Sequence, residues 1–172
     1  MSHADLLIEL GTEELPPKAL RSLRDAFAEG MRRELAAAHV TCGAVAAYAT
    51  PRRLAVHIEA VALQQPDQLE EKMGPALAGA FTADGAPTPA ALGFARSCGV
   101  AVETLARQGE GKQARLVHRA VRPGQPTREL LPHLVARALE TLPTPKRMRW
   151  GVGRDEFVRP LHWLVLLLGT EV

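Results

Sequence analysis

The side chains best suited to bind an anionic partner gather between residues 143 and 160. This segment carries five cations against two carboxylates, so its local charge of +3 exceeds the +2 of all 172 residues. Met148, Trp150 and Phe157 are interleaved with the charges, and cations mixed with flat apolar side chains suit a phosphate backbone and stacked bases. The five cations are Lys146, Arg147, Arg149, Arg154 and Arg159.

Within this segment we expect RNA contacts from Lys146, Arg147 and Arg149, followed by Trp150. The plainer alternative is that Trp150 packs inside the protein and leaves the cations in solvent. Arg159 precedes Pro160 between apolar residues, and it is equally consistent with a ligand contact and with a structural arginine that ties the loop to Glu13 or Glu14.

A second cationic pair, Arg52 and Arg53, lies at the tip of an expected hairpin, in the segment Thr50-Pro51-Arg52-Arg53. The guanidinium fork can bind a phosphate oxyanion through two hydrogen bonds, so both arginines are candidate RNA contacts. A solvated hairpin tip explains the same residues without any ligand, and the sequence leaves the two interpretations balanced.

Glu13 and Glu14 are the carboxylates most suggestive of chemistry, as a general acid and base or as a clamp for an amino group. Adjacent carboxylates diverge, however, and these precede Pro16-Pro17, where they are better placed to stabilise the start of a helix. His162 has no serine or carboxylate at a telling spacing, and Cys42 and Cys98 lie far apart. We therefore predict no catalytic residue and no metal site.

The composition is that of an ordinary globular protein, with 47% hydrophobic and 23% charged residues, and it favours one domain over 1–172. The apolar run 161–168 is too short for a bilayer, and the N-terminal residues lack the basic start of a signal peptide. We expect a soluble cytoplasmic protein with no membrane partner.

Periodicity predicts an α+β fold with a mixed, largely antiparallel sheet packed against two long helices. The helices are expected from Pro16-Pro17 onward, with apolar residues from Leu20 to Leu35, and over 127–142; a shorter helix runs from Thr88 to Cys98. Strands are expected at 5–11, in hairpins 45–49/54–63 and 104–108/113–121, and at 161–168. Residues 64–90 are rich in glycine, proline and alanine and are expected to form a loop-rich insertion.

The final strand runs into Gly169-Thr170-Glu171, a strand-to-turn sequence that normally leads into another strand. We infer a fragment of a longer chain.

An ordered series of motifs resembles the N-terminal part of the β subunit of bacterial two-subunit glycyl-tRNA synthetase. The series covers essentially the whole chain, and its specificity comes from the order of its pieces. They are GTEELPPKALRSL (11–23), TPRRLA (50–55), KMGPA (72–76), GFARSCG (93–99), LPTPKRMRWG (142–151) and FVRP followed by His162 (157–162).

The resemblance implies an assembly of two α and two β subunits that attaches glycine to tRNA(Gly). ATP and Mg would then bind on the α subunit, with no cofactor in this chain, while β contributes tRNA binding. The partners would be the α subunit, tRNA(Gly) and the remainder of β. The fold would be similar to the B3/B4-type module of the phenylalanyl-tRNA synthetase β subunit. An editing-like hydrolase of mischarged tRNA and a purely structural scaffold are the alternatives.

Overall fold

The computed structural model describes residues 2–82, 84–144, 148–149 and 156–172. The chain divides into two compact units. The main unit comprises residues 1–66 and 124–172, and the inserted unit comprises residues 67–123. The first part of the main unit therefore leads into the inserted unit, and the second part follows it along the chain.

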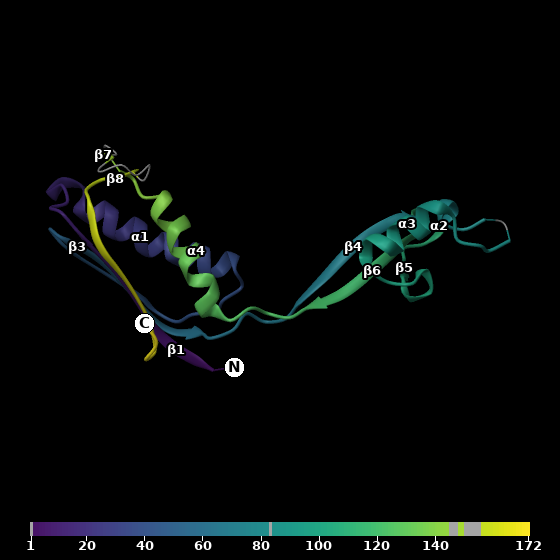
Figure 1. The fold of residues 1–172 in the computed structure, drawn as a ribbon, viewed down its shortest axis with the longest axis horizontal. Helices are drawn as coiled ribbons and strands as arrows, with labels where there is room; N and C mark the ends of the chain where they lie inside the picture. Colours follow the sequence, from purple (N-terminus) through teal and green to yellow (C-terminus); the bar gives the residue numbers. More distant parts are fainter. Residues whose placement is uncertain (1, 83, 145–147, 150–155) are drawn as a thin grey trace. The chain divides into compact units, whose positions relative to one another are not determined.

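The main unit is built on a four-stranded antiparallel sheet with the order β2-β3-β1-β9 (Figure 1). Its central strand β1 pairs with β3 on one side and with β9 on the other, so strands from both ends of the chain lie side by side. The strands are β1 (His3–Thr12), β2 (Val45–Thr50), β3 (Arg53–Ala62) and β9 (Leu161–Leu168).

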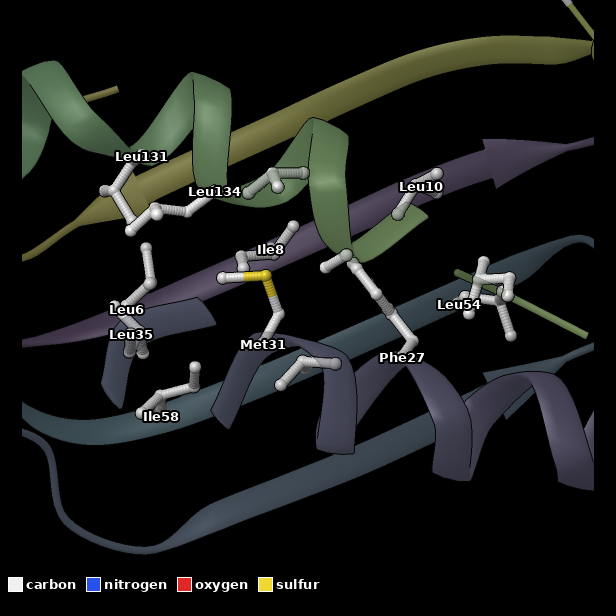
Figure 2. Packing of buried hydrophobic residues seen from close by; sticks show 14 of the residues in the cluster. Leu6, Ile8, Leu10, Phe27, Met31, Leu35, Leu54, Ile58, Leu131 and Leu134 are labelled. Carbon is white, nitrogen blue, oxygen red and sulfur yellow. The ribbon is translucent and has the colours of Figure 1, made fainter. Parts of the chain in front are cut away.

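Helices α1 (Pro17–Ala37) and α4 (Thr127–Glu140) pack together and bury apolar residues against one face of this sheet (Figure 2). Strand side chains alternate between the two faces, so every second residue of β1 and β3 is buried beneath the helices. The largest members of this core include Leu6, Ile8, Leu10, Phe27, Met31, Leu35, Leu54 and Ile58.

The inserted unit has its own three-stranded antiparallel sheet, in the order β4-β6-β5, and its own small core. The elements are β4 (Gln68–Ala76), α2 (Leu77–Ala80), α3 (Pro89–Cys98), β5 (Ala106–Gln108) and β6 (Arg115–Arg122). Short 3-10 turns cover Val102–Thr104 and Gly111–Gln113. A last pair of strands, β7 (Met148–Arg149) and β8 (Glu156–Phe157), is antiparallel.

The predicted α+β class with antiparallel sheets is confirmed, as are both predicted hairpins. The prediction for α3 also holds, since this helix ends at Cys98 and Gly99 follows in the left-handed conformation, with φ of 71°. Thr88 does not cap α3 with its side chain; its hydroxyl instead donates to the carbonyls of Gly79 and Ala80, at 2.8 and 3.2 Å.

Two expectations need correction. The segment 64–90 is not mainly loop, because residues 68–76 form strand β4 through hydrogen bonds to β6, a partner far along the chain. The inserted segment is also longer than expected, since it extends to residue 123. The described part of the chain holds four α-helices, so the short helix α2 is added to the three helices expected from the sequence. Within that same part of the chain, no helix has the length and apolar character needed to cross a membrane.

Candidate nucleic-acid interface

Three segments that are distant in sequence meet at one end of the main sheet. The turn between β1 and α1 lies between the tip of the β2–β3 hairpin and the residues that precede β9. Thr12 N donates to Arg52 O at 2.9 Å, and Leu15 N donates to Pro51 O at 2.7 Å. Glu13 N donates to Pro160 O at 3.0 Å. These main-chain bonds fix the tip of the β2–β3 hairpin and Pro160, the last residue of the second cationic segment, against residues 12–15.

Glu13 is the meeting point of two side chains from the flanking segments. Its Oε1 lies 2.7 Å from His162 Nε2 and 3.5 Å from Arg52 Nη2. All three side chains are about half exposed, so solvent and a ligand can reach them. The Glu13 side chain therefore contacts the hairpin tip and β9. Helix α1 begins after Pro16, which makes no side-chain hydrogen bond as its cap.

Arg159 joins the β1–α1 turn to the second cationic segment. Its Nε donates to the main-chain oxygen of Glu14 at 2.9 Å, and its Nη1 lies 3.1 Å from Met148 Sδ. The Glu14 carboxylate is not the partner of this arginine; the bond is to its carbonyl. Arg159 thus holds residues 14 and 148 close together, and Arg149 is next in the chain.

Trp163, Arg53 and Glu9 form a second group, which we call the Trp163 stack. The indole Nε1 donates to Glu9 Oε1 at 3.0 Å, and the Arg53 guanidinium carbon lies 5.6 Å from the ring centroid. Arg53 Nη1 is also 3.8 Å from Glu9 Oε2. The ring covers the bare backbone of Gly11, where a Cβ atom would overlap it. The aromatic side chain is nevertheless 41% exposed, so an additional flat group can reach it.

Of the candidates in the segment 146–150, the structure describes Arg149, whose Nη2 lies 3.1 Å from Glu156 Oε1. Lys146, Arg147 and Trp150 lie outside the described residues. The structure thus brings Glu13, Arg52 and His162 together, and Arg159 links this group to Met148 beside Arg149.

The described part of this sheet end is close to electrically neutral. Four arginines, at 52, 53, 149 and 159, face four glutamates, at 9, 13, 14 and 156. An incoming phosphate would therefore compete with carboxylates for the exposed guanidinium groups of Arg52 and Arg53. No group of three or more His, Cys, Asp or Glu residues in the described ranges is arranged to hold a metal ion.

Sequence reasoning missed the roles of Glu9, His162 and Trp163. His162 has no carboxylate at a telling spacing in the sequence, and its partner Glu13 lies 149 positions away. The antiparallel pairing of β1 with β9 sets Gly11 opposite Trp163 and so brings these side chains together. The single usable signal in the sequence was the glycine in β1, which often marks a close approach in a strand.

The comparisons with known proteins agree with one another. The family model described as glycyl-tRNA synthetase beta subunit matches residues 6–172. The glycine–tRNA ligase beta subunit of Hahella chejuensis is 52% identical over the whole chain, and that of Marinobacter nauticus is 53% identical. The corresponding protein of Pseudomonas aeruginosa is 51% identical. The chain spans about a quarter of the length of these relatives (25%), and it belongs to the glycyl-tRNA synthetase beta subunit family.

Proposed function

We propose that this chain serves glycine–tRNA ligase as a part of the β subunit that binds tRNA(Gly) and takes part in subunit assembly. In this proposal two α and two β subunits assemble in the cytoplasm, and glycine is activated with ATP and Mg on the α subunit. Membership of the family supports the reaction, and the arrangement of cationic residues supports the role of this region within it.

The observation that carries the proposal is the meeting of two cationic segments across the β1–α1 turn. Arg52 lies beside Glu13 on one side of the turn, and Arg159 bonds Glu14 on the other side. Because Arg159 also contacts Met148, the segment with Arg149 is held next to the same end of the sheet. Cations from residues 50–53 and 146–159 can then act on one stretch of a phosphate backbone.

Individual arginines take different roles in this arrangement. Arg52 and Arg53 are 58% and 57% exposed, so their guanidinium groups can turn toward a phosphate. Arg159 already donates to carbonyls of Glu14 and Val158, which suits a residue that positions the loops. We therefore assign RNA contact to Arg52, Arg53, Lys146, Arg147, Arg149 and Trp150, and a positioning role to Arg159.

The experiment is a tRNA(Gly) binding titration of the full assembly against salt, with the double substitution Arg147→Glu and Arg149→Glu. Reversing two charges that meet phosphates should weaken binding and reduce the slope of log K against log salt by about 1 for each lost phosphate contact. The double substitution Arg24→Glu and Arg32→Glu is the matched control, because it also reverses two charges, and both arginines lie on α1 and pair with a neighbouring carboxylate, at 2.7 and 2.8 Å.

Equal binding by the double variant and the wild type at every salt concentration would rule out this assignment of residues. Equal weakening by the double control variant would mean that the effect follows from overall charge and not from this interface.

One observation favours a second candidate, an editing-like hydrolase on a B3/B4-type fold. A histidine paired with a carboxylate at 2.7 Å can act as a general base toward water, and the His162–Glu13 pair is open to solvent. This candidate predicts that the assembly releases amino acid from mischarged tRNA and that His162→Gln abolishes the release. Identical rates of amino-acid release by the wild-type assembly and by the His162→Gln variant would exclude this candidate.

A structural scaffold is the third candidate, favoured by the hydrogen bonds that Arg159 and Glu13 make within the protein. It predicts that substitution of any of the arginines named above leaves both the capture of the α subunit and the binding of tRNA unchanged.

A further inference from the structure

Strand β9 has an apolar edge that no strand in the described part of the chain covers. It pairs with β1 on one side and lies last in the sheet order. Its sequence, LHWLVLLL, carries no lysine, arginine or proline of the kind that usually protects an edge strand. Leu164 is 47% exposed, although the residue opposite it, Leu10, is completely buried on the helix side. An edge of this kind is suited to take a further strand.

Main-chain hydrogen bonds identify which groups of β9 face the free edge. Leu168 N donates to Glu171 O at 2.9 Å, and Glu171 N donates to Leu168 O at 3.0 Å. Gly169 N instead donates to Asp5 O, on the β1 side, at 2.8 Å. Since these directions alternate along an antiparallel strand, Leu166 and Leu164 point their N–H and C=O groups to the free edge, while Leu167 and Val165 point theirs to β1.

The chain already turns back along that edge. Leu168 and Glu171 form an antiparallel bridge across Gly169 and Thr170, which is the first rung of a hairpin with a two-residue turn. Gly169 has φ of +60°, the left-handed conformation that such turns require. Arg128 on α4 lies 3.7 Å from Glu171, a weak exposed pair that is compatible with this direction of the chain.

We propose that the free edge of β9 holds a fifth strand of the main sheet, supplied by the polypeptide that follows Val172 in the longer β subunit. The bridge from Leu168 to Glu171 sets both the direction and the register of that strand. The relatives are about four times longer than this chain, which makes up 25% of their length, so they contain polypeptide to supply it.

The register also predicts the chemistry of the occupant. The residue two positions after Glu171 lies opposite Leu166, and the residue four positions after it lies opposite Leu164. Residues directly opposite each other share a face of the sheet, and this face is the one that packs on the helices. We therefore expect apolar side chains at these two positions, where they would cover the exposed part of Leu164.

Residue-resolved amide hydrogen exchange on the full-length β subunit tests the proposal. The amides of Val165 and Leu167 bond to β1 and serve as internal controls within the same strand. A fifth strand predicts that the amides of Leu164 and Leu166 exchange as slowly as these controls, roughly 100-fold or more below unpaired rates. Alternation, with slow exchange at 165 and 167 and fast exchange at 164 and 166, would overturn the proposal.

Two further outcomes of the exchange experiment would identify a different occupant of the β9 edge. Protection of Leu164 and Leu166 that disappears on dilution would assign the edge to a second copy of the subunit and overturn the intramolecular strand. Protection that arises only after the α subunit is added would overturn it in favour of a contact between subunits.

Discussion

At the scale of single residues, the sheet end is organised by side chains that serve several partners. The Trp163 ring covers Gly11, donates to Glu9 and lies against Arg53. Glycine is required at position 11 because any side chain would occupy the space of the indole ring. The Trp163 ring on β9 thus packs on Gly11 of the neighbouring strand β1, and the Arg53 guanidinium in turn packs on the ring.

The change Gly11→Ala tests this dependence. The new methyl group overlaps the Trp163 ring, so the variant should lose about 1–3 kcal/mol of unfolding free energy or expel the ring into solvent. Urea unfolding monitored by tryptophan fluorescence measures both outcomes.

The matched control for that change is Gly93→Ala in α3, where a Cβ meets nothing within 4 Å. It should stabilise the inserted unit slightly, because alanine favours a helix over glycine. Unchanged stability and fluorescence in Gly11→Ala would show that Trp163 does not pack on Gly11.

At the scale of elements, α1 and α4 are held together by close contact and by one buried carboxylate. Gly30 lets the helices approach, since a Cβ there would lie 3.3 Å from Ala138 Cβ. Glu34 on α1 is 4% exposed. Its Oε2 lies 2.9 Å from Arg137 Nε on α4, although the orientation is not that of a hydrogen bond, and its Oε1 lies 3.3 Å from Arg33.

The change Arg137→Ala should therefore destabilise the main unit by about 1–3 kcal/mol, because it leaves a buried carboxylate oxygen without its cation. Arg137 is itself 63% exposed, which places the effect toward the lower end.

Chemical denaturation of Arg137→Ala beside Arg32→Ala provides the measurement. Arg32 has an exposed glutamate as its partner, so its removal should cost less than about 0.5 kcal/mol. Equal stabilities of the two variants would contradict a role for the Glu34–Arg137 pair.

Elements with local signals could be predicted from the sequence, and elements held by distant partners could not. The segment 89–98 carries its own start and stop, Pro89 and Gly99, and it forms α3 as predicted. Strand β4 contains Gly74 and Pro75, which favour a loop, and it becomes a strand because β6 pairs with it. The same limit applies to the site, where the Glu13–His162 contact joins residues 149 positions apart.

At the scale of the whole molecule, the inserted unit leaves and returns to the main unit through paired segments. Gln65 N donates to Gln125 O at 3.0 Å, and Thr127 N donates to Leu63 O at 2.9 Å. Gln64 and Pro126 form an antiparallel bridge between these bonds. Residues 63–65, where the chain leaves the main unit, and residues 125–127, where it returns, are thus already paired like the two strands of a hairpin.

Replacing residues 67–123 by an Asn-Gly turn should leave the main unit folded, with its unfolding free energy changed by no more than about 1 kcal/mol, because the short closure favours the existing pairing. Thermal unfolding followed by circular dichroism measures the outcome. A variant without a cooperative transition would show that the main unit requires the inserted one.

Residues 50–53 and 146–159 are proposed to bind tRNA(Gly) together. Amide hydrogen exchange of the complete α and β assembly, measured with and without tRNA(Gly), tests this proposal. Exchange in both segments should become slower when tRNA is added. Protection of these segments on adding the α subunit, with no further change on adding tRNA, would contradict it.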